Sequence, residues 1–464
     1  MLVGFAALLV LYAQPRTSTL ERVLTSGTLV VAMRSGAASY HPGPNGPDGF
    51  EYALIRAFAE HLGVGLEPVF PPTLEALLDA TERHQVHMAA AGLSVTPERE
   101  QRLRFGLPYA FVTEQLIYRR GNPRPRSLDE LGPGDLHVVA GSSHEERLAG
   151  LRATRFPNLS WQSHPESNAE RLLGELDQGL LRATVADSLS FALSRRIFRH
   201  AAVAFDLAES KPVAWAFGRG NDDSLREAAD HFLGGFERSG GLARLHARYF
   251  GHVNRMNFVD TRQFWRHVRD RLPQYRRYFE EAAAETGIDW RLLAAIGYQE
   301  SHWRPEAVSP TGVRGIMMLT RAAAQQVGID DRRDPEQSIR GGARYLRLIE
   351  EKIPERILEP NRLWLTLAGY NVGFGHLEDA RVLTQRDGAN PDLWMDVKQR
   401  LPLLSKKAYY STVRHGFARG QEPVDYVDNI RNYYDLLIWY TTTRDCKALQ
   451  RLTGDEGEPP ELRC

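Results

Sequence analysis

Residues 294–303 read Ala-Ala-Ile-Gly-Tyr-Gln-Glu-Ser-His-Trp, an apolar segment that ends in a single carboxylate, Glu300. Asp289 is a good N-cap, so we expect a helix that begins there and carries Glu300 on the same face as Ile296. Burying an ionised carboxylate without a partner is costly, so a glutamate on this face is expected in a cleft, where it takes up a proton. Glu300 is therefore a candidate general acid. The alternative is a solvated glutamate at a helix end.

Three further motifs follow Glu300 and Ser301. Residues 315–320 read GIMMLT, residues 368–373 read AGYNVG, and residues 422–427 read EPVDYV. In this order the motifs resemble those of the goose-lysozyme-like lytic transglycosylases. The resemblance covers roughly residues 275 to 440, and it implies a mainly α-helical, lysozyme-like domain.

The residue types in these motifs also have interpretations of their own. Gly312 and Gly315 bracket a turn where a missing Cβ lets the backbone approach a ligand, although an ordinary loop explains them equally well. Methionines in the GIMMLT motif are typical of a core, although a flexible thioether can also line a sugar groove. Tyr370 and Asn371 offer a ring, a phenol and an amide that suit N-acetyl sugars, or a hydrogen-bonded pair that only holds the loop. Tyr426 lies in a helical stretch that continues to Tyr440, and by itself is typical of a core aromatic residue.

The resemblance assigns roles to these positions. It implies that Glu300 is catalytic, that the methionine position of the GIMMLT motif lines the saccharide cleft, and that Tyr426 lies beside the catalytic glutamate. The residues expected to bind or support the substrate are Ser301, Met317, Met318, Tyr370, Asn371, Glu422 and Tyr426.

The number of carboxylates bears on the chemistry. A hydrolysing glycosidase usually needs a pair at a defined separation. Glu306 lies beyond Pro305 and need not face the same cleft, residues 330–334 are typical of a solvated charged loop, and the family treats Glu422 as a supporting residue. One carboxylate suits a reaction in which water is not the nucleophile.

The resemblance implies such a reaction. Glu300 would protonate the glycosidic oxygen between N-acetylmuramic acid and N-acetylglucosamine in peptidoglycan. The resulting carboxylate would then deprotonate the muramoyl 6-hydroxyl, which closes a 1,6-anhydro ring. Proximity within one sugar replaces the attacking water, so a single group serves as acid and then as base.

Length and composition favour two folded units. The chain has 464 residues, which exceeds the usual size of a domain with one core. Of these residues 42% are apolar and 25% are charged, a normal composition for a globular protein. It carries 58 basic and 58 acidic residues, so no overall field favours nucleic acid. The two cysteines, Cys446 and Cys464, are expected in a C-terminal tail over residues 446–464. A disulfide could close that tail, but two isolated thiols do not support a metal site, and we expect no cofactor.

Residues 1–13 form an apolar run of about the length of the hydrophobic region of a signal sequence and too short to span a bilayer comfortably. We expect residues 1–20 to be a signal or a membrane-associating segment and the protein to be exported. No basic residue precedes the run, so it is either an incomplete signal or a retained anchor. No cysteine follows it, which excludes a lipoprotein signal.

Between residues 27 and 250 the pattern alternates between strands and helices. Apolar runs at residues 29–33, 86–92, 136–140 and 183–187 are typical of buried strands, and residues 52–62 of an amphipathic helix. The alternation predicts an α/β domain of parallel strands.

This half resembles the family 3 periplasmic solute-binding proteins, which hold amino acids between two lobes. The matching pieces are Gly49-Phe50-Glu51, residues 92–99, residues 141–143 and Asp187-Ser188. The resemblance implies that Arg99 clamps a ligand carboxylate and that Asp187 binds an ammonium group. The alternatives are that Arg99 pairs with Glu98 or Glu100 on the surface and that Asp187 only caps a helix. The expected ligand-binding residues are Tyr40, Phe50, Ser94, Arg99, Ser142 and Asp187.

Over almost its whole length the chain thus resembles the membrane-bound lytic murein transglycosylase F family. We expect a two-lobed α/β domain over residues 27–250, which modulates activity by binding an amino acid or muropeptide, and a lytic domain over residues 258–445. The resemblance implies a periplasmic enzyme attached peripherally to the outer membrane of a Gram-negative bacterium, with peptidoglycan strands as its partner. Two alternatives stay open, a non-catalytic sensor that binds solute or peptidoglycan and a lysozyme-like hydrolase.

Overall fold

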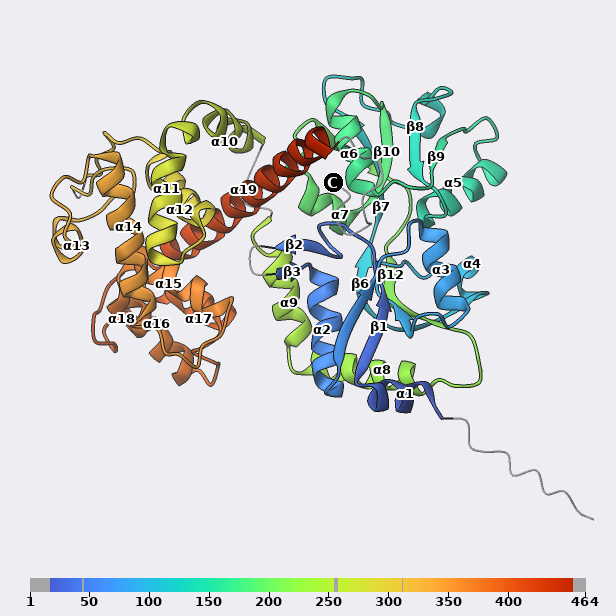
Figure 1. Ribbon diagram of the computed structural model, residues 1–464, viewed down its shortest axis with the longest axis horizontal. Coiled ribbons are helices and arrows are strands. Elements are labelled where there is room, and N and C mark those ends of the chain that lie inside the picture. The colour runs from blue at the N-terminus through green and yellow to red at the C-terminus, as the bar shows by residue number, and fades with distance from the viewer. Residues whose placement is uncertain (1–16, 44–45, 254–257, 311, 454–464) are drawn as a thin grey trace, which may run out of the picture.

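The computed structural model describes residues 17–43, 46–253, 258–310 and 312–453. Its N-terminal half is built on two five-stranded sheets, and its C-terminal half is a set of packed helices (Figure 1). Most of the predicted signal segment, and Cys464, lie outside the described residues.

The first lobe is a sheet covered by helices. Its strands in spatial order are β4 (Gly65–Val69), β1 (Thr28–Ala32), β5 (Met88–Ala89), β12 (Lys211–Gly218) and β6 (Leu103–Val112). Its helices are α1 (Thr19–Ser26), α2 (Phe50–Leu62), α3 (Leu74–Glu82), α4 (Pro97–Glu100), α8 (Ser224–Arg238) and α9 (Gly241–Phe250). A small hairpin of β2 (His41–Gly43) and β3 (Gly46–Asp48) projects from this lobe.

The second lobe repeats the arrangement on a smaller scale. Its strands in spatial order are β11 (Ala201–Asp206), β7 (Glu114–Arg119), β10 (Ala183–Asp187), β8 (Leu136–Val139) and β9 (Gln162–His164). Its helices are η1 (Leu128–Glu130), α5 (Ser143–Thr154), α6 (Ala169–Gln178) and α7 (Ser188–Ser194).

The sheets are mixed, and the four predicted strands pair in parallel within them, β1 with β5 and β8 with β10. Strands β1, β4 and β5 pair in parallel, as do β8, β9 and β10, but β6 and β12 pair antiparallel, and β7 runs antiparallel to β10 and β11. The chain passes from the first sheet to the second between β6 and β7 and returns between β11 and β12. Each lobe therefore contains a long strand that runs in from the other lobe.

The first lobe begins before residue 27. Helix α1 has a capping box made by Ser18 and Glu21, and it buries Val23 completely. The backbone N–H of Leu20 donates to the hydroxyl of Ser224, which ties α1 to α8. Residues 19–20, at the end of the predicted signal or membrane-associating segment, thus lie in α1 and belong to the folded lobe.

The C-terminal half packs its helices around one apolar core. Its elements are α10 (Phe258–Asp270), α11 (Leu272–Thr286), α12 (Trp290–Ser301), α13 (Arg321–Gln326), α14 (Pro335–Glu350), α15 (Asn361–Val372), α16 (Phe374–Arg386), α17 (Trp394–Arg400), η3 (Leu401–Ser405), α18 (Lys407–Tyr410) and α19 (Gln421–Thr453). The predicted helix that begins at Asp289 is confirmed, because the Asp289 side chain accepts from the N–H of Arg291 at the start of α12. Most of α12 is buried, so it forms the centre of this half.

Helix α19 joins the two halves. With 33 residues it is about 50 Å long, and it runs from the helical half to the second lobe (Figure 1). It extends to Thr453, so the prediction of a tail that begins at residue 446 is wrong up to that point, and Cys446 lies within the helix. None of the helices in the described residues is long and apolar enough to cross a membrane.

Candidate functional site

Glu300 lies in the last turn of α12, half-buried and facing α19. The hydroxyl of Tyr426 donates a hydrogen bond of 2.7 Å to Glu300 Oε1. Burial raises the pKa of Glu300 to about 7, and the hydrogen bond from Tyr426 acts in the opposite direction. The carboxyl group can therefore hold a proton near neutral pH.

Tyr426 and Tyr370 form an aromatic wall beside this carboxyl. Their rings stack with centroids 6.5 Å apart, and the Tyr370 hydroxyl donates to the carbonyl of Met317 at 2.9 Å. Burial raises the pKa of both phenols well above the ordinary value, and the negative charge of Glu300 adds to the effect. Both phenols therefore stay protonated and act as hydrogen-bond donors.

Ser301 holds the GIMMLT turn against α12. Its hydroxyl donates to the carbonyls of Ile316 at 2.9 Å and Gly297 at 3.1 Å, and the residue is buried. A Cβ on Gly315 would lie 1.8 Å from the carbonyl oxygen of Arg332, so only glycine fits there. In this structure the Ser301 hydroxyl, which is predicted to bind or support the substrate, is hydrogen-bonded to backbone carbonyls.

The backbone around Glu300 is strained. Within the described residues four non-glycine residues have a positive φ, and three of them, His302, Trp303 and Met318, lie next to Glu300 or in the GIMMLT turn. Such strain costs of order 1–3 kcal/mol per residue and persists only where the surrounding packing enforces it. Trp303 provides such packing, because it is buried and its indole N–H donates to the carbonyl of Ala294 at 2.8 Å.

The other predicted residues differ in how much they expose. Asn371 is exposed at the end of α15 and Met318 is half-buried, whereas Met317 is fully buried in the core. Glu422 is exposed and pairs with Arg419 at 3.3 Å, one turn before Tyr426 on α19. Met317 is therefore a core residue whose backbone, rather than its thioether, meets Tyr370.

A second carboxylate does not contribute to the pKa of Glu300 among the described residues, where burial and Tyr426 are the causes. A carboxylate close by would raise the pKa further by repulsion. Glu306 and residues 330–331 are exposed on loops, as the sequence indicates. Within the described residues, Glu300 is thus the carboxyl that this site offers for proton transfer.

The N-terminal half has a cavity of about 170 Å³ between its lobes. Of the six predicted ligand-binding residues, Phe50, Ser142 and Asp187 line it. Asp187 accepts from the N–H groups of Leu189 and Ser190, so it caps α7 while it faces the cavity.

Tyr40, Ser94 and Arg99 do not line this cavity. Tyr40 packs its ring against Tyr52 and Phe70, and Ser94 is buried and forms a backbone bridge with Val213 of β12. Their predicted part in a ligand site therefore stays a prediction.

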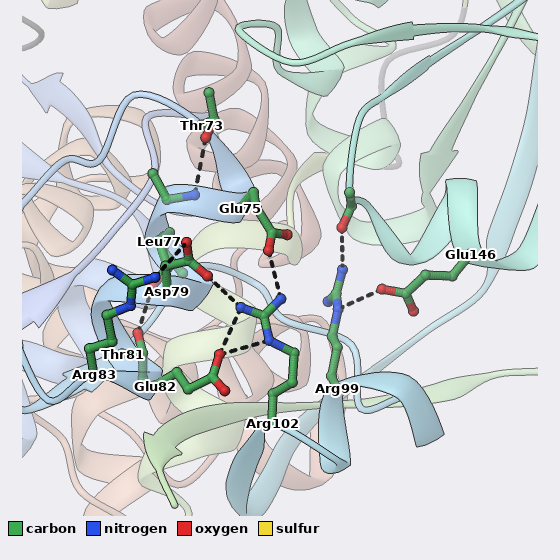
Figure 2. A network of polar contacts seen from close by, with 12 residues as sticks. Thr73, Glu75, Leu77, Asp79, Thr81, Glu82, Arg83, Arg99, Arg102 and Glu146 are labelled. Atoms are coloured by element: carbon green, nitrogen blue, oxygen red, sulfur yellow. Dashed lines mark hydrogen bonds and ion pairs between the residues drawn. The ribbon is translucent and has the colours of Figure 1, made fainter.

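Arg99 instead joins the two lobes. Its guanidinium donates to Glu146 of α5 at 3.1 Å (Figure 2), and it also donates to the carbonyls of Ser94 and Gly141 at 3.2 Å. It lies apart from the neighbouring cluster around Arg102, and it pairs with neither Glu98 nor Glu100. Groups of the protein itself therefore hydrogen-bond to Arg99 in this structure, and its role as a carboxylate clamp stays a prediction.

Other ionisable side chains take its place in the cavity. Arg34, Glu51, His144 and Glu170 line the cavity, and none of them is among the predicted residues. Burial raises the pKa of Glu51 to about 7 and also raises that of Glu170. Glu51 stands in the motif Gly49-Phe50-Glu51, where a carboxylate at the start of an amphipathic helix was an available signal.

The two halves meet at α19 through a polar cluster. Arg196, directly beyond α7, contacts Asn432 and Asp435 of α19, and His252 contacts Asp435 at 2.8 Å. Burial, with the positive charge of Arg431, lowers the pKa of His252 to about 3, so this histidine is neutral. The helix that presents Tyr426 to Glu300 is thus held by the lobe that carries Asp187.

The described residues contain no cluster of three or more His, Cys, Asp or Glu side chains that could hold a metal ion.

Comparison with protein families divides the chain in the same way as the folds. Residues 29–252 match the family of bacterial extracellular solute-binding proteins, family 3, and residues 277–392 match the transglycosylase SLT domain.

Two curated relatives align over nearly the whole chain. A protein of Alkalilimnicola ehrlichii named membrane-bound lytic murein transglycosylase F 1 is 48% identical over 95% of this chain and 89% of its own length. A Yersinia enterocolitica protein named membrane-bound lytic murein transglycosylase F is 46% identical over 93% of this chain and 88% of its own length.

Two solved structures resemble about half of this chain. An amino acid ABC transporter substrate-binding protein from Streptococcus pneumoniae, bound to L-arginine, matches with a TM-score of 0.45 at 22% identity, covering 51% of this chain and all of that one. A mutant of ArgBP from T. maritima gives a TM-score of 0.45 at 20% identity, covering 50% of this chain and 99% of that one.

Proposed function

Because this chain belongs to the membrane-bound lytic murein transglycosylase F family, we propose that Glu300 is its single catalytic acid and base. The protein is a murein-degrading lytic transglycosylase, a lyase that acts on a polysaccharide. The observation that carries the proposal is the half-buried Glu300 carboxyl, with a pKa of about 7 and one hydrogen bond, from Tyr426.

The first step transfers a proton from Glu300 to the glycosidic oxygen. Tyr426 holds Oε1, so Oε2 is the oxygen that delivers the proton. The bond between C1 of N-acetylmuramic acid and the bridging oxygen breaks, and N-acetylglucosamine leaves with the proton. Raising the pKa of a carboxyl group to near the working pH is the usual way to keep such an acid protonated.

The second step uses the same carboxyl as a base. The muramoyl 6-hydroxyl loses its proton to Glu300 while its oxygen bonds to C1, which closes the 1,6-anhydro ring and restores the acid. Atoms and charges balance without water. The nucleophile belongs to the same sugar, so its proximity replaces a second carboxylate. Asn371, exposed at the end of α15, is available to bind an N-acetyl group.

Digestion of sacculi in water labelled with heavy oxygen tests this reaction. Closure of the ring by the 6-hydroxyl leaves no label in the released muramoyl ends. A lysozyme-like hydrolase would place one labelled oxygen at every new reducing end, and that result would contradict the proposal.

The division of labour follows the two folds. Residues 27–250 bind a small solute, an amino acid or a muropeptide, in the cavity that Asp187 lines, and residues 258–445 perform the cleavage. The contacts of Arg196 with Asn432 and Asp435 support a modulating role for the first half, because they join the end of α7 to the helix that carries Tyr426.

An Arg196→Gln variant tests this coupling, because it leaves the Asp187 cavity and the Glu300 site intact. We expect the lytic rate to change several-fold with the same products. A rate equal to that of the wild type, in a variant that melts at the wild-type temperature, would contradict a modulating role for this contact.

The place of action follows from the substrate. Peptidoglycan lies in the periplasm of Gram-negative bacteria, and the relatives are named as membrane-bound. The protein works there, attached peripherally to the outer membrane. Cell fractionation tests this location, and recovery of the protein in the cytoplasmic fraction would contradict it.

A further inference from the structure

Residues 406–420 form a cationic surface that the proposed reaction does not use. The segment reads Lys-Lys-Ala-Tyr-Tyr-Ser-Thr-Val-Arg-His-Gly-Phe-Ala-Arg-Gly and contains no acidic residue, although the whole chain has as many acidic as basic residues. Its basic side chains, Lys406, Lys407, Arg414 and Arg419, are exposed. We call residues 406–420 the basic segment.

Three of these four cations lack a carboxylate partner. Within the described residues no ion pair is formed by Lys406, Lys407 or Arg414, and Arg419 pairs only with the exposed Glu422. The segment also exposes aromatic rings, since Phe417 is 57% exposed and packs edge-on against Tyr410. Unpaired cations beside exposed rings are typical of a surface that receives an anionic partner.

The segment is nevertheless held in a fixed shape. The buried carboxylate of Asp379, on α16, accepts from the backbone N–H groups of Arg414, His415 and Gly416 at 2.8–3.2 Å. Arg386 adds hydrogen bonds to the carbonyl and hydroxyl of Thr412. The cations therefore project from a preorganised loop, which lowers the entropic cost of binding.

The basic segment adjoins the Glu300 site on two sides. A Cβ on Gly375 would lie 2.8 Å from the ring of His415, so the segment packs against the start of α16, a few residues beyond Tyr370 and Asn371. At its other end the segment leads directly into α19, which carries Tyr426. An anionic group beside a glycan bound at Glu300 would therefore meet these cations.

We infer that the basic segment is a subsite for the peptide substituents of the glycan strand. This inference rests on the proposed function, because only a peptidoglycan substrate brings such peptides to the site. Each peptide ends in a carboxylate, which Lys407 and Arg414 bind through charge-assisted hydrogen bonds, while Phe417 covers apolar side chains of the peptide. The segment thus favours peptide-bearing strands over bare ones.

The test compares two substrates: peptide-bearing glycan strands and the same strands after an amidase has removed the peptides. The full chain is assayed as wild type, as a Lys407→Gln/Arg414→Gln variant, and as an Arg269→Gln/Arg277→Gln control. The control removes the same charge from exposed residues on α10 and α11, away from α18 (Figure 1).

For the Lys407→Gln/Arg414→Gln variant we expect KM on peptide-bearing strands to rise about five-fold with kcat retained, as two exposed ionic contacts would give. Cleavage of bare strands and the control variant should match the wild type. In the wild type the preference for peptide-bearing strands should shrink at high salt.

Three outcomes would overturn the inference. In the first, the variant loses activity equally on both substrates. In the second, it loses activity on neither substrate. It could instead lose binding to phosphatidylglycerol vesicles with both activities intact, which would assign the surface to a lipid membrane. If the wild type cleaves neither substrate, the proposed function itself fails, and that result differs from all three.

Discussion

Glu300 in the helical half and Glu51 in the first lobe are two glutamates whose pKa burial raises to about 7. Glu51 accepts hydrogen bonds from the hydroxyls of Ser39 and Tyr109 and from the N–H of Gly92. Glu300 accepts one, from Tyr426. The two glutamates therefore have similar pKa values, but they differ in the number of hydrogen bonds that each carboxyl group accepts.

The difference indicates what each carboxyl can do. Three donors from three segments hold Glu51 as a junction in the first lobe, where a change of protonation disturbs several bonds at once. Glu300 keeps one oxygen for an exchange of protons with a substrate. A raised pKa therefore identifies a reactive group only when its hydrogen-bond partners leave it free.

The largest expected effect separates the two glutamates by activity. Glu300→Gln keeps the shape of the side chain but cannot transfer a proton, so we expect lytic activity to fall by about 10²–10⁴-fold. Glu51→Gln should keep activity within a few-fold. Release of soluble fragments from sacculi measures both variants. Equal losses would show that the comparison drawn from their hydrogen bonds is wrong.

The next effect separates them by stability. Glu51→Ala leaves three donors without an acceptor, and each buried orphan costs about 1–3 kcal/mol, so we expect a loss of several kcal/mol. Glu300→Ala leaves only the Tyr426 hydroxyl and should cost about 1–3 kcal/mol by the same measure. Denaturant unfolding at neutral pH compares them. A larger loss for Glu300→Ala would contradict the assigned roles.

The smallest effect concerns the tyrosine beside each glutamate. Tyr426→Phe removes the bond that lowers the pKa of Glu300, so that pKa should rise and the fall of kcat/KM above about pH 7 should move to higher pH. We also expect kcat to fall about ten-fold, the usual order for one hydrogen bond. Tyr109→Phe, the matched change beside Glu51, should leave the pH profile in place. A Tyr426→Phe profile that moves to lower pH would contradict the geometry.

The sequence predicted the structure of the helical C-terminal half more closely than that of the N-terminal half. The start of α12 at Asp289 and the placement of Glu300 follow from local rules, namely an N-cap and a face with helical spacing. The contact between Glu300 and Tyr426, 126 residues apart, was expected only through the family resemblance. Local patterns do not encode such a contact.

In the N-terminal half, distant groups decide contacts that the sequence does not show. Arg99 is predicted to clamp a ligand carboxylate, and in the structure its guanidinium donates to Glu146, 47 residues away in the sequence. The residues near Arg99 in the sequence do not predict its contact with Glu146. Similarly, α19 continues past residue 445 although a helix end was expected there, and its polar cluster with Arg196 depends on how the two halves meet.

The central claim, that Glu300 alone serves as acid and base without water, is tested most directly by mass spectrometry of muropeptides. Purified sacculi are treated with the wild type and with Glu300→Gln, and the released products are weighed. The account predicts products one water lighter than reducing muropeptides from the wild type and none from the variant. Reducing muropeptides from the wild type, or anhydro products from the variant, would contradict it.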